Sequence, residues 1–418
     1  MKVSRLKSKL KLFYTVFIVP PKKLRLPKKS DVLIYDACGA EVMVPYLIKY
    51  SATIMAVRGE SINVPCLLRA ALRLSFWKGK PLNAYAEEFI KAVSPKVVIT
   101  SIDNNISFYT VSKNFPSIKT IFLQNGTRSE SGDVFDRLNI LEKTNYYVDY
   151  MLVHGEAIGM HYMKYVTGQF VPIGSLKNNA VSISRSELVG DVLFISQWHN
   201  KPEGDSPFYI EQDGTPVYWE QFFAVEIITL KFLSRWCAEN SKCLKICGRE
   251  KDKDGTEKQF FADCLKESVW EYLPRIDNCS SYKYIDSAEI VVFIDSTLGY
   301  ESIGRGKRTA SFSCRMTNGK KNFFKFGWPA DLPSNGPFWT NDQDEAQFQR
   351  VMDYLNTTSD EGWEQARQRY SLDLMEFDLG NKCFIALLDQ LLLVQDTSYN
   401  SLNLRADGHS KTFIYERI

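Results

Sequence analysis

The sequence has little of several features that would mark a specialised class of protein. Histidine occurs four times in 418 residues, and the formal net charge is only +3. A charge surplus this small argues against a nucleic-acid partner, because nucleic-acid-binding domains carry a marked basic excess. No uninterrupted apolar run approaches the roughly 20 residues that a membrane-spanning helix needs. Internal repeats and low-complexity tracts are also missing, so the chain is expected to fold throughout.

The nine cysteines are an odd number scattered among hydrophobic runs. This usage is typical of unpaired, buried thiols in a reducing compartment, and it predicts a cytoplasmic protein. Cys243 and Cys247 are spaced loosely like metal ligands, but they lie in an apolar segment with few histidines to complete a site. We therefore predict neither a metal site nor a bound cofactor.

Positive charge is concentrated at the N-terminus, where ten Lys and Arg residues precede the first acidic residue, Asp31. The apolar run 12–19 among them is too short to span a membrane and is followed by no small-residue cleavage site. Residues 1–30 are thus predicted to form a basic arm. Either the arm is simply solvated, or it attaches the protein peripherally to the anionic inner membrane surface.

From Asp31 onward, short β-rich runs alternate with longer helical segments, a pattern that indicates an α/β protein with parallel sheets. Residues 31–180 are predicted to form one Rossmann-like domain and residues 190–345 a second, with a polar linker at 176–190 and C-terminal helices and a tail at 346–418. The expected strands are 32–35, 52–57, 97–100, 120–123, 150–153, 192–195, 244–247, 291–294 and 309–312. Helices are expected at 219–240, 257–267, 299–305, 344–356 and 373–394.

Ligands of open parallel sheets bind beyond the carboxyl ends of the strands, so the polar clusters at these ends are the candidate site. In the second domain, the strand 291–294 runs into Ser296 and Thr297, and a helix begins at once. The N-terminus of a helix attracts phosphate, and Glu301, one turn further on, is placed to reach a ribose diol. The same residues could equally be a helix cap, with Ser296 or Thr297 as N-cap.

Two further strand ends of the second domain support a nucleotide pocket. Gly248 would let the backbone approach a ligand, and Arg249 could offer a charge-assisted fork to phosphate. Ser196 and Gln197 supply another pair of donors. A surface salt bridge is the alternative role of Arg249.

The first domain is then expected to hold the acceptor and the reacting centre. Asp103 directly follows a buried strand and is the candidate nucleophile or general base, with Glu60 as the second candidate for proton transfer. Asp103 could also be an ordinary loop or capping aspartate, and the arginines could be structural partners of Glu60 or Asp36. The candidate substrate-binding residues are Arg58, Asn104, Asn105, Gln124, Asn125 and Arg128.

Eight short motifs are familiar when taken together: RGESIN (58–63), IDNN (102–105), QNG (124–126), IGSLKNN (173–179), FISQW (194–198), DSTLGYE (295–301), FGWP (326–329) and GPFWTN (336–341). They resemble a bacterial family of surface carbohydrate biosynthesis proteins over nearly the whole chain. The resemblance implies a glycosyltransferase-B (GT-B) architecture, in which two tandem Rossmann-like domains face each other across a cleft. It also implies a role in capsule or lipopolysaccharide assembly.

More distantly, the second half looks like capsule transferases that use ulosonic acids activated by cytidine monophosphate (CMP), and like glycerophosphotransferases of teichoic acid synthesis. Several CMP-ulosonate transferases carry a His-Pro pair where this chain has Gly248 and Arg249. For retaining members, the resemblance implies an aspartate nucleophile in the acceptor domain, for which Asp103 is the candidate by position.

The leading hypothesis is therefore a metal-independent glycosyltransferase that moves a nonulosonic acid from a CMP donor to a glycan or lipid-linked glycan acceptor. The alternatives are a UDP- or GDP-sugar glycosyltransferase, a polyol-phosphate transferase using His154 or His161, a hydrolysing epimerase, or a non-catalytic glycan-assembly factor.

Overall fold

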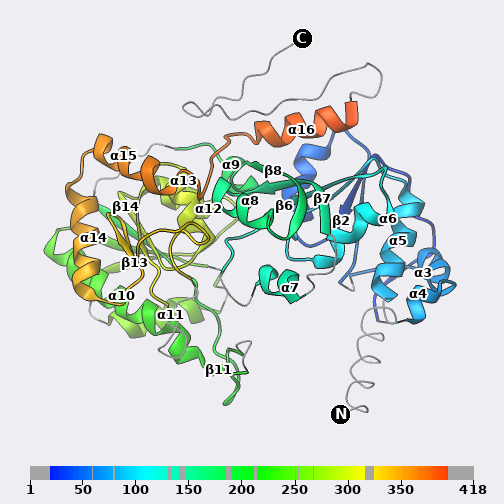
Figure 1. Ribbon diagram of the computed structural model, residues 1–418. Coiled ribbons are helices and arrows are strands. Elements are labelled where there is room, and N and C mark those ends of the chain that lie inside the picture. Colours follow the sequence, from blue (N-terminus) through cyan, green and yellow to red (C-terminus); the bar gives the residue numbers. More distant parts are fainter. Residues whose placement is uncertain are drawn as a thin grey trace, which may run out of the picture.

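The computed structural model describes residues 19–393, except 59, 79–80, 130–132, 141–145, 185–189, 211–213, 250, 253, 267 and 316–323. Two parallel β-sheets, each covered by helices, lie side by side (Figure 1). The predicted α/β fold with two parallel-sheet units is thus confirmed.

The first sheet has six parallel strands in the order β3-β2-β5-β6-β7-β8. Numbered along the chain within this sheet, the order is 2-1-3-4-5-6, a doubly wound arrangement. The elements of this half are β1 (Lys22–Lys23), β2 (Val32–Tyr35), α2 (Ala40–Met43), η2 (Val44–Leu47), β3 (Ala52–Met55), β4 (Ile62–Asn63), α3 (Val64–Ala71), α4 (Leu74–Trp77), α5 (Pro81–Val93), β5 (Val97–Thr100), η3 (Ile106–Thr110), α6 (Val111–Asn114), β6 (Lys119–Leu123), α7 (Val134–Ile140), β7 (Tyr146–Val153), α8 (Glu156–Tyr162), β8 (Val166–Pro172) and α9 (Leu176–Asn179).

The second sheet has seven strands in the order β13-β12-β9-β14-β15-β17-β16, of which only β16 is antiparallel to its neighbour. Its first five strands follow the order 3-2-1-4-5 of the Rossmann fold. The elements are β9 (Asp191–Ile195), β10 (Tyr209–Ile210), β11 (Pro216–Val217), α10 (Trp219–Glu239), β12 (Cys243–Cys247), α11 (Thr256–Leu265), β13 (Trp270–Leu273), α12 (Ser280–Ser287), β14 (Ile290–Phe293), α13 (Thr297–Gly304), β15 (Arg308–Phe312), β16 (Asn335–Gly336), β17 (Trp339–Thr340), α14 (Glu345–Thr357), α15 (Asp360–Ser371) and α16 (Lys382–Leu393).

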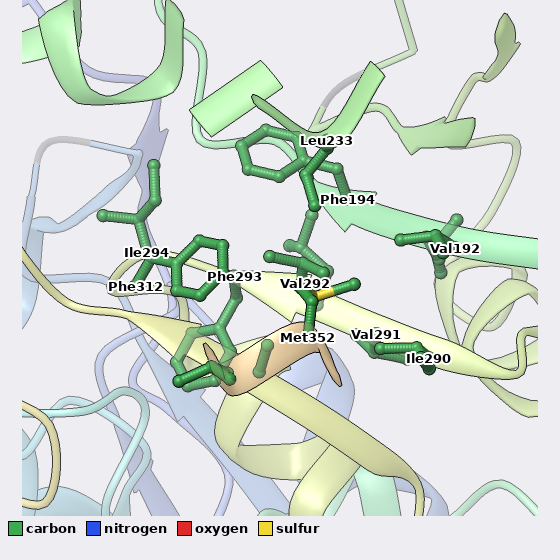
Figure 2. Packing of buried hydrophobic residues seen from close by; sticks show 14 of the residues in the cluster. Val192, Phe194, Leu233, Ile290, Val291, Val292, Phe293, Ile294, Phe312 and Met352 are labelled. Carbon is green, nitrogen blue, oxygen red and sulfur yellow. The ribbon is translucent and has the colours of Figure 1, made fainter. Parts of the chain in front are cut away.

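Each sheet has its own hydrophobic core. In the second sheet, the apolar side chains of β9 and β14 are buried because both strands lie in the middle of a sheet with helices on both faces. Figure 2 shows Phe194 and Val292 from these strands beside Leu233 of α10 and Met352 of α14. A strand that is buried on both faces needs a continuous apolar run, and for this reason the strands could be predicted from the sequence.

Helix α16 returns from the second half and covers the first sheet (Figure 1). Its Phe384, Leu387 and Leu388 share a core with Val32 and Val97 of β2 and β5. The predicted start of the helix expected at 373–394 is therefore wrong, because α16 begins at Lys382. A separate helix, α15, ends at Ser371, and the connection from 372 to 381 carries the chain back.

The segment predicted as a polar linker is buried at its start. Asn178 and Asn179 are fully buried, and the Arg305 guanidinium donates to the Asn178 side-chain oxygen (3.1 Å) and to the Val181 carbonyl (2.9 Å). Arg305 also forms a buried ion pair with Asp286 of α12. Polar residues here satisfy one another where the two halves meet, so their polarity does not signal exposure.

Other expectations also need correction. Strand β8 was not predicted, because this edge strand contains Thr167, Gly168 and Gln169 and therefore has no continuous apolar run. Cys38 and Cys279 are exposed, so the cysteines are not uniformly buried. None of the helices in the described part of the chain is long and apolar enough to cross a membrane.

The basic arm divides into two parts. Residues 1–18 lie outside the described residues. Lys22 and Lys23 form β1, which pairs with β4, and the Asn63 side chain donates to the Arg25 carbonyl (2.7 Å). The later part of the arm is thus attached to the first half of the molecule.

Candidate functional site

A polar cleft of about 460 Å³ lies between the two halves. On the first side it is lined by the segment that follows β6, where Thr127, Arg128, Ser129 and Asp133 lie. The lining residues of the second side are Ser196, Gln197, His199, Phe208, Phe222, Arg249, Asp295, Ser296, Thr297, Tyr300, Phe324 and Lys325. The cleft therefore joins five of the predicted nucleotide-binding residues to one predicted substrate-binding residue.

The second sheet presents its topological switch point to this cleft. Strands β9 and β14 are neighbours, and the chain leaves them in opposite directions along the sheet. The crevice between such strands is the usual ligand position in a doubly wound sheet. Ser196 and Gln197 follow β9, while Ser296 and Thr297 follow β14, so sheet topology alone explains why these four residues meet.

Helix α13 begins at the cleft. Ser296 is its N-cap, and the Ser296 hydroxyl accepts from the Leu298 N–H at 3.3 Å. The Thr297 hydroxyl accepts from the Thr127 N–H at 2.9 Å and so links the helix to the first side of the cleft. The capping role is therefore present. The first N–H groups of α13 also lie at the cleft, where their partial positive charge favours an anion.

A buried carboxylate holds the ends of β9 and β12 together. Glu257 of α11 accepts from the Ser196 hydroxyl (2.6 Å), the Arg249 N–H (3.0 Å) and the Tyr272 hydroxyl (2.9 Å). The Arg249 guanidinium donates to the carbonyls of Gln197 and Trp198, each at 3.4 Å. These bonds fix the backbone of Arg249 and direct its side chain along the cleft.

Gly248 does not line the cleft. A Cβ atom at this position would lie 2.4 Å from the Tyr272 hydroxyl oxygen. The residue has to be glycine so that β12 can pack against Tyr272. The structure therefore gives Gly248 a packing role, and the predicted approach to a ligand is not what requires it.

Asp295 is held in the cleft by a buried arginine. The Arg315 guanidinium donates to Asp295 (2.7 Å) and to Glu226 of α10 (2.5 Å), and it lies over the Phe222 ring at 3.9 Å. Burial raises the pKa of Glu226, although Arg315 acts against this shift. Arg315 thus fixes Asp295 in position at the cleft.

Asp103 is completely buried and does not line the cleft. Its carboxylate accepts from Arg128 Nε (3.0 Å), from the Tyr162 hydroxyl (2.6 Å) and from the Asn125 N–H (3.3 Å). Arg128 also contacts Asp133 (3.3 Å), and its side chain is only 7% exposed. The candidate nucleophile Asp103 and the candidate substrate-binding residue Arg128 therefore pair with each other.

The neighbouring amides are also engaged. Asn125 accepts from Arg128, and Asn105 caps η3 by accepting from the Ser107 N–H at 3.2 Å. Gln124 is buried and joins the Gly126 carbonyl to the His154 N–H. Asn104 is exposed and is not part of the cleft lining.

Arg58 and Glu60 lie elsewhere, beyond the end of β3. Arg58 is half-exposed and pairs with buried Asp36 (2.8 Å), while Glu60 accepts from the Arg58 N–H (3.0 Å). Strand β3 is the edge strand farthest in order from β6, so these two residues are not brought to the cleft. The alternative role of Arg58, as a partner of Asp36, is the one that the structure shows.

Glu301 also lies away from the cleft. Its carboxylate is buried and accepts from the Tyr282 hydroxyl at 3.0 Å. Burial raises the pKa of Glu301, while hydrogen bonds from Ser175 and Tyr282 oppose this effect. One turn separates Thr297 from Glu301 on α13, and that turn moves the side chain from the cleft to the junction between the two halves.

Several cleft residues were not among the predicted site residues. Asp295 directly follows β14 and could have been selected by the same strand-end rule that selected Ser296. Asp133 directly precedes α7, where it accepts from the Val134 N–H (2.7 Å). His199, Phe208, Phe222, Phe324 and Lys325 come from loops and from α10, and no local pattern indicates that they meet.

The cleft can bind an anion and could carry out proton transfer. Arg249, Lys325 and the start of α13 supply positive charge on the second side, while Asp133 supplies a carboxylate on the first. Within the described ranges, no three His, Cys, Asp or Glu side chains are grouped to hold a metal ion.

Two facing parallel-sheet units with a polar cleft between them define a GT-B-like fold, and comparison with solved structures agrees. A structure titled "S. aureus MnaA-UDP co-structure" matches with a TM-score of 0.52 and 11% identity, over 88% of this chain and 97% of that one. A Listeria monocytogenes structure, described as a "putative UDP-N-acetylglucosamine 2-epimerase", matches with a TM-score of 0.51 and 10% identity, over 87% and 96% of the two chains. These likenesses establish the fold.

The family follows from the sequence. Residues 121–392 match the model of a family described as "putative O-antigen biosynthesis protein", and this match covers more than half of the chain. The chain belongs to this family. Among curated proteins, none matches the chain significantly.

Proposed function

We propose that this protein is a glycosyltransferase of O-antigen synthesis that binds the nucleotide of its sugar donor in the cleft. The observation that carries the proposal is that the switch point of the second sheet faces Thr127, Arg128, Ser129 and Asp133 of the first half across one cleft. Donor and acceptor groups can meet only where both halves contribute. This cleft fulfils that condition.

The second side of the cleft suits the phosphates of a donor. The N–H groups at the start of α13 and the Arg249 guanidinium would neutralise the charge that develops on the leaving phosphate. Asp295 would be an unfavourable neighbour for phosphate if it were not paired, but Arg315 holds both of its oxygens. The pairing lets a carboxylate lie in the cleft without repelling the donor as strongly.

Asp133 is the proposed general base on the first side. Its carboxylate lines the cleft from the first half and is held by the Val134 N–H and by Arg128. An incoming hydroxyl group would lose its proton to such a carboxylate as the bond to the sugar forms. Asp103 supports this arrangement indirectly, because it fixes Arg128.

The proposed donor is a nucleoside diphosphate sugar, with UDP as the first nucleotide to test. One solved structure that shares the fold, that of S. aureus MnaA, is a co-structure with UDP. A CMP-ulosonate donor would need a cation for its carboxylate on the acceptor side. Arg128 is occupied there by Asp103, Asp133 and Asn125, and Arg58 lies beyond β3.

A ligand screen tests the proposal. A nucleotide at 100 times its dissociation constant should stabilise the protein by about 2.7 kcal/mol, which gives a measurable thermal shift. We expect UDP to raise the melting temperature more than CMP, GDP or CDP. A shift with CMP alone would instead assign the cleft to CMP sugars, and no shift with any nucleotide would contradict the proposed site.

Turnover separates the transferase from its alternatives. With a UDP-sugar and a lipid-linked glycan, a transferase releases UDP only when the acceptor is present. Release of UDP without acceptor, with a changed sugar as product, would indicate a hydrolysing epimerase. Binding without release under either condition would indicate a non-catalytic assembly factor.

A further inference from the structure

Helices α3 and α4 present large apolar side chains to solvent. Leu72 is 89% exposed, Leu74 76% and Trp77 72%, and Leu68 is also exposed. Leu68 and Leu72 are four residues apart and therefore lie on one face of α3. We call Leu68, Leu72, Leu74 and Trp77 the α3–α4 face.

The packing of these helices does not need this face. Their inner side is already filled by Cys66, Ala70 and Phe76, which share a core with Tyr85 and Phe89 of α5. The Trp77 indole N–H donates to the Ala71 carbonyl at 2.7 Å, so the polar atom of the ring is satisfied within the protein. What remains outside is apolar. Exposed apolar surface of this kind commonly marks an interaction site.

Positive charge borders the α3–α4 face. Arg69 and Lys78 are exposed on the same two helices. Strand β1 brings exposed Lys22 and Lys23 next to the start of α3, because β1 pairs with β4 and β4 leads directly into that helix. No Asp or Glu occurs between residues 60 and 87, nor before residue 31. Exposed leucine and tryptophan side chains bordered by exposed Lys and Arg are complementary to an anionic lipid surface.

We propose that the α3–α4 face docks on a bilayer that carries anionic lipid headgroups, with Leu72, Leu74 and Trp77 entering the interfacial layer. Tryptophan and leucine are favoured at this depth, while Lys and Arg contact the headgroups. Helices α3 and α4 lie at the end of the molecule away from the second sheet (Figure 1). Docking there leaves the cleft between the two sheets uncovered.

The proposal is independent of the reaction and is tested by binding to vesicles. The full-length protein is sedimented with phosphatidylcholine vesicles that either contain or lack phosphatidylglycerol. The apolar variant is Leu72→Gln/Leu74→Gln. Its matched control is Val269→Gln/Ile276→Gln, which removes two exposed apolar side chains from the second half. The charge variant is Arg69→Gln/Lys78→Gln, with Lys231→Gln/Lys258→Gln as control.

We expect the wild-type chain to bind only the vesicles with phosphatidylglycerol, and less strongly as salt is added. The charge variant should lose about fivefold in partition for each charge removed. The apolar variant should lose about tenfold or more. Both controls should bind like the wild type, and thermal unfolding should show that all variants remain folded.

Two results would overturn the proposal. The first is equal binding by the α3–α4 variants and their controls. The second is an apolar variant that binds vesicles normally but loses self-association in light scattering, which would make a second copy of the chain the occupant of this face.

Discussion

Arg128 and Arg249 each follow a strand of a parallel sheet and each line the same cleft, yet their surroundings differ. Arg128 is surrounded by Asp103 and Asp133 and is nearly inaccessible. Arg249 donates to two backbone carbonyls and lies beside the start of α13. Arg128 on the first side thus holds two carboxylates in place, whereas the Arg249 guanidinium on the second side contacts the backbone that follows β9.

The largest expected effect tests the first side of the cleft, where Asp103 pairs with Arg128. Asp103→Ala leaves the Arg128 guanidinium buried with one carboxylate fewer, so the free energy of unfolding should fall by about 3 to 5 kcal/mol. Urea unfolding measures this change. In Glu345→Ala, which removes an exposed partner of Arg235, the loss should stay below about 1 kcal/mol. If Asp103→Ala unfolded at the same urea concentration as the wild type, Asp103 would not be the residue that holds Arg128 in place.

The next effect tests the second side of the cleft, where Arg249 lies. Arg249→Ala removes a charge-assisted contact, so nucleotide binding should weaken by about 1.5 to 3 kcal/mol while the fold remains intact. Isothermal titration with UDP gives the affinity, and Arg235→Ala serves as the control because it removes an exposed arginine from α10. Unchanged affinity in Arg249→Ala would mean that the second side does not bind phosphate through this residue.

The third prediction concerns the pH dependence of stability that buried His154 causes in the first half. His154 and Arg128 line the same small pocket. Burial lowers the pKa of His154 to about 3 from its ordinary 6.5, and the positive charge of Arg128 lowers this pKa further. The unfolded chain therefore takes up the proton first, and stability is lost as the pH falls below about 6.5. Between pH 7 and pH 5, this group should cost about 2 kcal/mol of unfolding free energy.

His154→Gln should remove that part of the pH dependence. His161, whose pKa is lowered to about 4 mainly by burial, acts in the same direction, and His161→Gln is the comparison variant. The raised pKa values of Glu226 and Glu301 act in the opposite direction, since they favour the folded state at low pH. An identical pH profile in His154→Gln and wild type would contradict the assignment.

The smallest effect concerns the bond that joins the two sides. Thr297→Val keeps the shape of the side chain but leaves the Thr127 N–H without its acceptor, at a cost of about 1 kcal/mol. Nucleotide affinity should change by a similar amount only if the two sides move relative to each other. Thr357→Val, at the exposed end of α14, is the control for the substitution itself.

The strands and the strand-end residues were the predictable part of this molecule. Buried parallel strands are continuous apolar runs, so β2, β5, β9 and β14 could be located within a residue or two. The rule that ligands bind beyond the carboxyl ends then indicated Ser196 and Ser296, which do line the cleft. These inferences need only local pattern and topology.

The partner of each charged side chain in the folded structure could not be predicted in this way. Nothing local distinguishes Arg128 from Arg249, because the carboxylate that occupies Arg128 comes from 25 residues earlier in the chain. Glu301 shows the same difficulty over a single helical turn. Arg315 and Glu226 are 89 residues apart, and only the folded structure shows that they fix Asp295.

Helix α16 has a consequence for the order in which this chain can mature on the ribosome. The first sheet is made early in synthesis, but its outer apolar layer contains Phe384, Leu387 and Leu388, which are made near the end. Until residue 393 has emerged, Val32 and Val97 lack their final cover. The first half of the sequence is therefore the last part of the molecule to be completed, and a chain truncated before α16 would expose this surface to aggregation.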